Sequence, residues 1–169
     1  MGKGSRAAAA AADDLPPLLK GFGAVPPLVT DLNLSLDDRF LYVSCWGTGE
    51  LKQFDVSDPF NPVETSSVKL GGIVRRQAHP SRPDTPLNGA PQMIEISRDG
   101  KRLYVTNSLY RTWDDQFYPD GIKGWLAKID VRSNGIELDR SGVLEFDGMR
   151  PHQVHLEGGD ASSDSYCFE

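Results

Sequence analysis

Two stretches of the chain, LSLDDRFLYVS (34–44) and ISRDGKRLYVT (96–106), follow one pattern. Each begins with an apolar residue and Ser, continues through an Asp, a turn residue and a basic residue, and ends in a Leu-Tyr-Val run. An Asp-led turn followed by aromatic and β-branched residues predicts a tight turn that leads into a β-strand. The chain therefore contains an internal repeat built from β-structure.

A second predicted strand follows each copy of the repeat. ELKQFDVSD (50–58) and WLAKIDVRSNG (125–135) both carry an apolar residue, Asp and Val, and both then run into turn residues. Further strands are expected from LVTDLNLS (28–35) and PQMIEIS (91–97) ahead of the turns, and from VETSSVKLGG (63–72) after the first copy. These patterns predict an all-β fold made of four-stranded units.

Four-stranded units that recur every few tens of residues are typical of β-propeller blades, whose faces are buried only against neighbouring blades. A closed propeller needs at least about four blades, and this chain has room for about two or three. We therefore expect a partial β-propeller whose missing blades come from the rest of a longer chain or from a partner chain. A small two-sheet β-sandwich is the alternative.

Three segments fall outside the repeat. Residues 1–27 mix an alanine tract with two Pro-Pro pairs, which predicts a flexible, low-complexity tail or linker, with or without a short helical turn, ahead of a domain over 28–169. Residues 71–93 and 108–124 are rich in Gly, Pro, Asp or aromatic residues and show little alternation. We expect them to be long loops that converge on one surface, where binding sites usually lie.

Charge and composition exclude several classes of function. The formal net charge is -6, and nucleic-acid binding needs a basic surface instead. No apolar run approaches the roughly 18 residues of a membrane span, and the N-terminus lacks the apolar core of a signal peptide. We expect a cytoplasmic protein, or a periplasmic one if a longer chain carries a signal peptide.

The two cysteines, Cys45 and Cys167, form no CxxC pair. They therefore indicate neither a zinc ribbon nor a disulfide framework. Cys45 ends a predicted strand and is expected to be buried as a small apolar residue. Cys167 lies near the C-terminus and is expected to be exposed and oxidisable.

The segments LSLDDRFLYVSCWGTGELKQFDVSDPFNPV, GAPQMIEISRDGKRLYVTNSLYRTWDDQFYPDGI and PHQVHLEGGDASSDSY resemble the C-terminal part of the selenium-binding protein family. Its members include methanethiol oxidases, and SCWGTGEL and RPHQVHL look most like the bacterial branch. The resemblance extends from Leu28 to Glu169. It implies a seven-bladed β-propeller that uses copper and O2 to convert the thiol methanethiol into formaldehyde, hydrogen sulfide and hydrogen peroxide. Selenium is a second candidate cofactor by the same resemblance.

Copper ligands in that family are histidines, several of them in the N-terminal half. The late histidine of the family, followed three residues on by a basic residue and then by Gly-Gly-Asp, corresponds to His152. His155 stands where the family usually has Arg. The selenium-associated cysteine of mammalian members lies in the N-terminal half, so neither Cys45 nor Cys167 is its counterpart.

His152 is therefore the main candidate copper ligand. On an extended segment His152 and His155 fall on opposite faces, because their separation is odd, so His155 is a weaker candidate. His79 is another weak candidate, since its loop is expected to leave it in solvent. Asp160 follows a Gly-Gly pair and is expected either to orient a ligand histidine or to cap its own turn.

Three aromatic residues in the 108–124 segment, Trp113, Phe117 and Tyr118, are candidates for the wall of a small thiol pocket. The alternative is that they pin the long loop to its sheet. The resemblance thus implies the C-terminal portion of a methanethiol oxidase, incomplete as a catalyst alone. Two alternatives stay open: a non-catalytic module that binds selenium or thiols or serves as a scaffold, and a truncated gene product.

Overall fold

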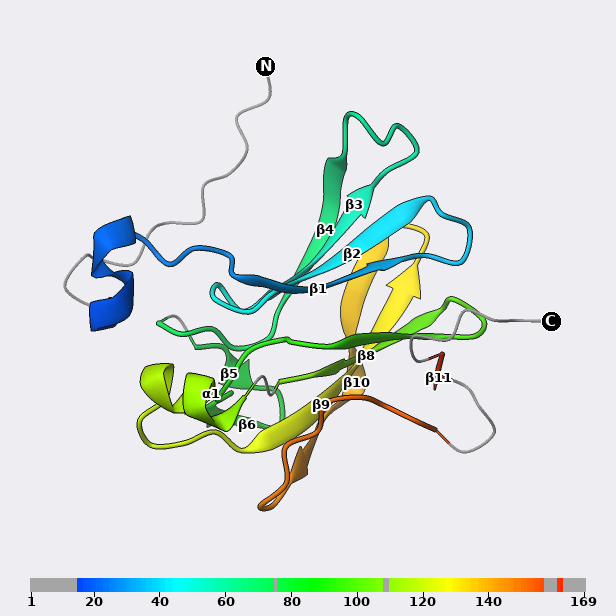
Figure 1. The fold of residues 1–169 in the computed structure, drawn as a ribbon. Coiled ribbons are helices and arrows are strands. Elements are labelled where there is room, and N and C mark those ends of the chain that lie inside the picture. The colour runs from blue at the N-terminus through cyan, green and yellow to red at the C-terminus, as the bar shows by residue number, and fades with distance from the viewer. Residues whose placement is uncertain (1–14, 75, 108–109, 157–160, 163–169) are drawn as a thin grey trace.

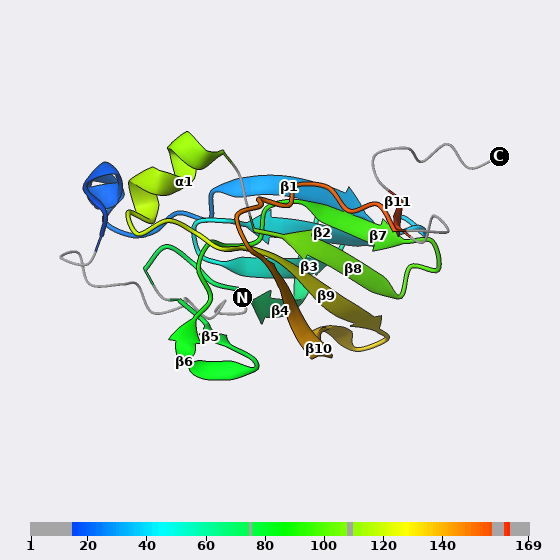
Figure 2. The same cartoon turned by 90° about the horizontal axis from the view of Figure 1, so that it is seen from below.

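The computed structural model describes residues 15–74, 76–107, 110–156 and 161–162. Most of this structure is antiparallel β-sheet, arranged as two sheets that stack against each other (Figure 1). A short two-stranded hairpin and two small helices lie at the same end of the sheets, with the hairpin on the opposite side from the helices in Figure 2 (Figures 1 and 2). The expectation of a mainly β protein is confirmed, and the described residues form no closed barrel.

The first sheet has the strand order β1-β2-β3-β4, and the second sheet has the order β10-β9-β8-β7-β11. The strands of the first sheet are β1 (Val29–Leu34), β2 (Phe40–Cys45), β3 (Glu50–Asp55) and β4 (Val63–Lys69). Those of the second are β7 (Ile94–Ser97), β8 (Arg102–Thr106), β9 (Gly124–Arg132), β10 (Gly135–Phe146) and β11 (Ala161–Ser162). The remaining elements are η2 (Pro17–Phe22), α1 (Arg111–Phe117) and the hairpin of β5 (Ala78–His79) and β6 (Arg82–Pro86).

The two copies of the sequence repeat form the same turn. In the first copy, Asp37 Oδ1 accepts hydrogen bonds from Ser35 Oγ at 2.6 Å and from Arg39 N at 3.3 Å. In the second copy, Asp99 Oδ1 accepts from Ser97 Oγ at 2.7 Å and from the amide two residues later at 3.0 Å. The bonds from Ser97 and the backbone lower the pKa of Asp99 to about 2. The repeat is thus confirmed at the level of individual hydrogen bonds.

The inner faces of the two sheets pack together. At one edge, Asn33 Nδ2 on β1 donates to Ile94 O on β7 at 3.1 Å, and Ile94 N donates to Asp31 Oδ2 at 2.7 Å. At the other edge, Ile136 N on β10 donates to Ser66 Oγ on β4 at 3.1 Å. Buried apolar side chains fill the space between, and each fully buried Leu, Ile or Val among them stabilises the fold by roughly 1.5–3 kcal/mol. They are Tyr42, Leu51, Leu70, Leu87, Ile94, Ile96, Leu103, Val105, Trp125, Ala127, Ile129 and Ile136.

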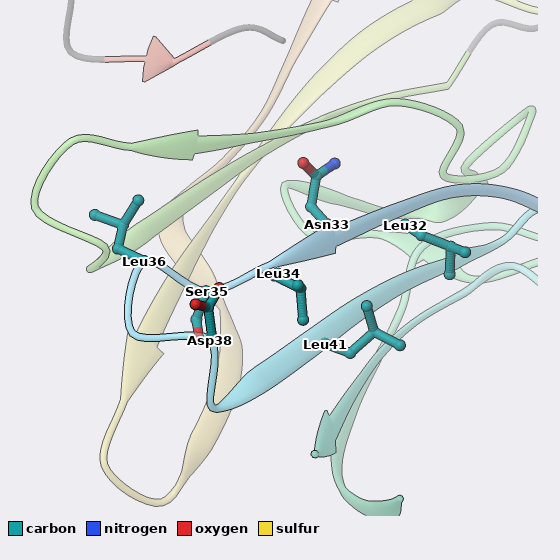
Figure 3. A pocket seen from close by; sticks show the side chains of 7 residues that line it. All are labelled: Leu32, Asn33, Leu34, Ser35, Leu36, Asp38 and Leu41. Carbon is teal, nitrogen blue, oxygen red and sulfur yellow. The ribbon is translucent and has the colours of Figure 1, made fainter. Parts of the chain in front are cut away.

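The outer faces of the two sheets differ. On the first sheet, Leu32, Leu34 and Leu41 line an open apolar groove of about 570 Å³, and Leu32 is 56% exposed. Figure 3 shows these leucines on one side of the sheet, while Asn33 points the other way, toward the second sheet. On the outer face of the second sheet, by contrast, Val154 packs against Tyr104. The segment after β10 therefore covers a face whose counterpart on the first sheet is open.

Packed structure begins before the predicted boundary at residue 28. Pro17 starts the 3-10 helix η2, where proline is favoured because the first helical positions need no N–H partner. Leu19 from this helix is 4% exposed and joins a second apolar cluster around Trp46. Residues 1–14 of the predicted tail lie outside the described residues. No helix in the described part of the chain is long and apolar enough to cross a membrane.

Candidate functional site

The two C-terminal histidines lie on the segment that follows β10. Both His152 and His155 are exposed, and between them Val154 is buried. The hydroxyl of Thr106, at the end of β8, donates a hydrogen bond to His152 O at 2.8 Å. The backbone of the segment is therefore fixed to the second sheet, while the imidazole of His152 stays accessible.

An ion pair holds the same segment two residues earlier. Arg150 Nη1 contacts Asp114 Oδ2, and Arg150 Nη2 lies 3.5 Å from Asp115 Oδ1. Both carboxylates belong to α1, and the side chain of Asp114 is completely buried. The helix of the 108–124 insertion thus contacts the histidine segment directly.

Aromatic packing fixes α1 in turn. Trp46, in the turn between β2 and β3, has its ring centroid 5.3 Å from that of Phe117 and 6.0 Å from that of Tyr118. Trp113 lies 6.3 Å from Trp46 and is partly exposed. This arrangement corresponds to the alternative in which the aromatic residues pin the insertion. A contact between these rings and a thiol stays a prediction.

The two long segments outside the repeat meet at this cluster. Ile73 and Ala90, from the 71–93 segment, pack with Phe117 and Tyr118 from the insertion. Burial raises the pKa of the Tyr118 phenol well above its usual range, so that group stays protonated. The convergence of the two segments is confirmed, and it produces a packed core instead of an open pocket.

His79 does not lie where the sequence placed it. It was expected in solvent, but it is 3% exposed on β5, so that prediction is wrong. The reason is the hairpin of β5 and β6, which has no alternating pattern in the sequence. Ser81 N donates to His79 Nδ1 at 3.1 Å, and this assigns the proton of the neutral ring to Nε2. A protonated Nε2 offers no lone pair to a metal ion, so the hydrogen bonding opposes ligation by His79.

A cluster of charges surrounds the Nε2 side of His79. Glu145 Oε1 lies 3.8 Å from Nε2, which is too long for a hydrogen bond. Glu145 Oε2 instead accepts from Arg82 Nη2 at 2.6 Å and lies 3.3 Å from Lys123 Nζ. The hydrogen bond from Arg82 is the main cause that lowers the pKa of Glu145. The cluster ties β6 and the loop before β9 to β10, which is a structural role.

Comparison with known proteins identifies the family. The family model for the 56 kDa selenium binding protein matches residues 6–167. This chain belongs to the selenium-binding protein family. The match begins upstream of Leu28, where the resemblance in the sequence began, and so includes the region of η2.

The relatives of this selenium-binding protein are much longer than the chain. Methanethiol oxidases from Xenopus tropicalis and Homo sapiens are each 42% identical to it, with 83% of this chain and 35% of theirs covered. A crystal structure of a hypothetical selenium-binding protein from Sulfolobus tokodaii is 59% identical, with a TM-score of 0.81 over 92% of this chain and 34% of that one. The selenium-binding protein chain therefore spans about a third of the length of the relatives it matches.

The residues present fit only part of the copper site that the family resemblance implies. The His152 imidazole is exposed on a fixed backbone, and copper suits imidazole ligands. However, no group of three or more His, Cys, Asp or Glu side chains within the described residues is placed to hold a metal ion. Asp160, the proposed partner of a ligand histidine, lies outside those residues. Within the described residues, His152 therefore fits a single imidazole ligand, and no complete metal site is present.

Cys45, the one cysteine within the described residues, adds no ligand to this site. Cys45 is buried, as predicted, and burial raises the pKa of its thiol to about 11. A thiol in that state is a poor nucleophile and a poor metal ligand, because both functions need the thiolate. Cys167 lies outside the described residues.

No local sequence pattern indicates the residues that hold the His152 segment. Asp114 and Asp115 have no partner that the local sequence indicates, because Arg150 lies 36 residues after Asp114. Thr106 belongs to the repeat, and its hydroxyl contact to the C-terminal segment has no local signal. Two adjacent acids among aromatic residues of a long insertion, together with a lone Arg before Pro-His, form the sequence pattern that could have suggested the ion pair.

Proposed function

We propose that this chain is part of a copper-dependent methanethiol oxidase in which His152 supplies one copper ligand. The reaction would convert methanethiol, O2 and water into formaldehyde, hydrogen sulfide and hydrogen peroxide. The observation that carries the proposal is the accessible imidazole of His152 on a backbone fixed by Thr106 at 2.8 Å. Relatives named methanethiol oxidase at 42% identity support the same assignment.

The proposal includes residues beyond this chain. The leucine groove on the outer face of the first sheet is the surface on which a further four-stranded sheet would pack, as the inner face packs on the second sheet. Repetition of this packing would produce the seven-bladed propeller that the resemblance implies. The remaining copper ligands would come from those additional blades, either in a longer chain or in a partner.

The metal and the protein residues would have different roles in the reaction. Copper, when bound, supplies the redox centre that couples oxidation of the thiol to reduction of O2. In this chain, His152 provides a nitrogen ligand, and Thr106 fixes the carbonyl of the same residue. The packing of Val154 on Tyr104 keeps the segment against the second sheet. These contacts fix the backbone from which the His152 imidazole projects.

Copper measurements on the native assembly test the proposal. The protein would be isolated from its source cells with every chain that co-purifies, and copper and selenium would be measured in the same acid digest. We expect His152→Ala to lose most of the copper and the methanethiol-dependent release of peroxide. His155→Ala is the matched control, because it removes an exposed imidazole from the same segment, and it should keep both. Full copper content and full activity in His152→Ala would overturn the proposal.

A second candidate function is a non-catalytic module that binds thiols or selenium or completes a scaffold. The lack of a three-ligand metal group within the described residues favours it. It predicts that the native assembly, with all its chains present, contains no stoichiometric copper and releases no peroxide from methanethiol. Selenium in the same digest would then support a selenium-binding role.

A further inference from the structure

The insertion helix α1 is connected to the His152 segment by one buried charge. The Asp114 carboxylate is fully buried and pairs with Arg150, whose side chain is 25% exposed. An ionised carboxylate without a partner is costly to bury, so the pair opposes separation of α1 from the segment. The second guanidinium nitrogen lies 3.5 Å from Asp115, so Arg150 spans both acids.

The backbone between this ion pair and His152 has little conformational freedom. The residue between them is Pro151, whose ring fixes its own φ and disfavours helical conformations at Arg150. Beyond it, Thr106 holds the carbonyl of His152. The backbone at His152 is therefore held by an ion pair two residues before it and by a hydrogen bond to its own carbonyl.

The helix end of this connection is rigid. Asp114 N donates to Tyr110 O at 2.8 Å, and Tyr118 N donates to Asp114 O at 2.8 Å, which fixes the backbone of the acid. One residue before Asp114, Trp113 contacts Trp46, and three residues after it, Phe117 does the same. The position of Asp114 is thus set by packing against the first sheet.

We infer that Asp114 and Arg150 are positioning residues that hold the His152 imidazole where a metal ligand is required. The inference rests on the proposed function for the role of His152 itself. It assigns to the insertion between β8 and β9 a task that the repeat cannot perform. Through Trp46, it also makes the placement of the ligand depend on the first sheet.

The test uses the double variant Asp114→Asn/Arg150→Gln in the native assembly. Removing both charges together avoids a buried, unpaired carboxylate, so the variant is expected to fold. Arg132→Gln is the matched control, because Arg132 also contacts two carboxylates, Asp130 at 3.4 Å and Glu137. Arg150→Lys, which retains the charge opposite Asp114, is the conservative variant and should recover most of the wild-type behaviour.

Three measurements separate positioning from general stability. Amide hydrogen exchange, followed by mass spectrometry, should accelerate at least about tenfold in residues 148–156 of the double variant, while the β2–β3 hairpin exchanges as in wild type. The dissociation constant for copper should rise about 10- to 100-fold, and the Cu(II) electron paramagnetic resonance spectrum should change. Arg132→Gln should leave all three unchanged.

The possible outcomes distinguish a failure of the positioning role from a failure of the proposed function. Unchanged exchange in residues 148–156, or faster exchange with unchanged copper affinity and spectrum, would overturn the positioning role. Loss of copper in His152→Ala together with wild-type copper binding in the double variant would overturn it too, and the proposed function would stand. Retention of copper in His152→Ala would overturn the proposed function, whereas exchange in residues 148–156 would still decide whether the ion pair anchors the segment.

Discussion

The two copies of the repeat are alike before their Leu-Tyr-Val strands and differ after them. Ahead of β2 and β8, the same Ser-Asp turn forms with the same hydrogen bonds. After β2, residues 46–49 return the chain directly to β3, whereas after β8 the chain runs through residues 107–123 and α1 before β9 begins. The repeated part thus builds the sheets, and the unrepeated part reaches the histidine segment.

The residue that directly follows each copy of the repeat shows how this difference is stabilised. Cys45 and Asn107 occupy the same place, directly after or at the end of the Leu-Tyr-Val strand. Cys45 leads into a short turn and is buried without charge. Asn107 instead accepts from Trp125 N at 2.8 Å and donates to the carbonyls of Asn88 and Lys123 at 3.1 and 2.8 Å. Its side chain holds the start and the end of the long insertion together.

The largest expected effect comes from removing the side chain that joins the short turn to the long insertion. Trp46 is fully buried and contacts three aromatic residues of the insertion. We expect Trp46→Ala to lower the free energy of unfolding by about 3–5 kcal/mol, since it leaves a large cavity. Urea denaturation followed by circular dichroism measures the change.

A surface aromatic residue provides the control for this prediction. Phe60→Ala removes a side chain that is 90% exposed and should change the free energy of unfolding by less than about 0.5 kcal/mol. A cost below about 1 kcal/mol for Trp46→Ala would show that the short turn and the insertion are stabilised independently.

A smaller effect is expected when Asn107 is replaced by Cys, the residue at the equivalent position after the first copy. Asn107→Cys removes three buried hydrogen bonds to the backbone, and a buried group left unpaired costs about 1–3 kcal/mol. We expect a loss of about 2–4 kcal/mol in the free energy of unfolding, measured with a reductant present, and faster hydrogen exchange across the insertion.

Asn61→Cys is the control for the Asn107→Cys substitution. The exposed amide of Asn61 donates to Asp58 in a surface turn, so its removal should cost less than about 1 kcal/mol. Equal costs for the two variants would mean that Asn107 does not clamp the insertion.

The parts of the fold that the sequence predicted correctly are local. The turn at Ser35 and Asp37 and the strands on either side of it depend on residues within a few positions, and the second copy confirms the pattern. Burial of Cys45 followed from its place at a strand end. The meeting of the two long segments was also correct, because both leave the same end of adjacent sheets.

The features that the sequence did not predict depend on contacts between distant segments. His79 is buried by a hairpin whose strands carry no alternation. A short helical turn in the tail was one expectation, but the packing of η2 in the cluster around Trp46 had no sequence signal. The pair of Asp114 and Arg150 forms only after the C-terminal segment folds back over the second sheet. Such contacts leave no periodic signal, which is why the support of His152 was visible only in the structure.

The smallest expected effect tests how closely the two turns match. Asp38 has φ 56° and the equivalent Gly100 has φ 68°, so both copies require a left-handed residue at one position. This conformation costs free energy for a non-glycine residue, although the cost for Asp is smaller than for most residues. We expect Asp38→Gly to raise the free energy of unfolding by about 0.5 kcal/mol and Gly100→Asp to lower it by about 1 kcal/mol, as measured by urea denaturation at neutral pH.

The space around Gly100 makes this a test of the backbone alone. A Cβ added there would lie 3.6 Å from Leu36 Cδ1, an ordinary contact, so the cost of Gly100→Asp comes from φ and not from a clash. Gly100→Asn should cost less than substitution by Ala at the same position, because Asn adopts the left-handed region more readily. If Gly100→Ala and Gly100→Asn cost the same, the strain lies elsewhere in the turn. The two copies would then share their hydrogen bonds without sharing the conformational requirement at this residue.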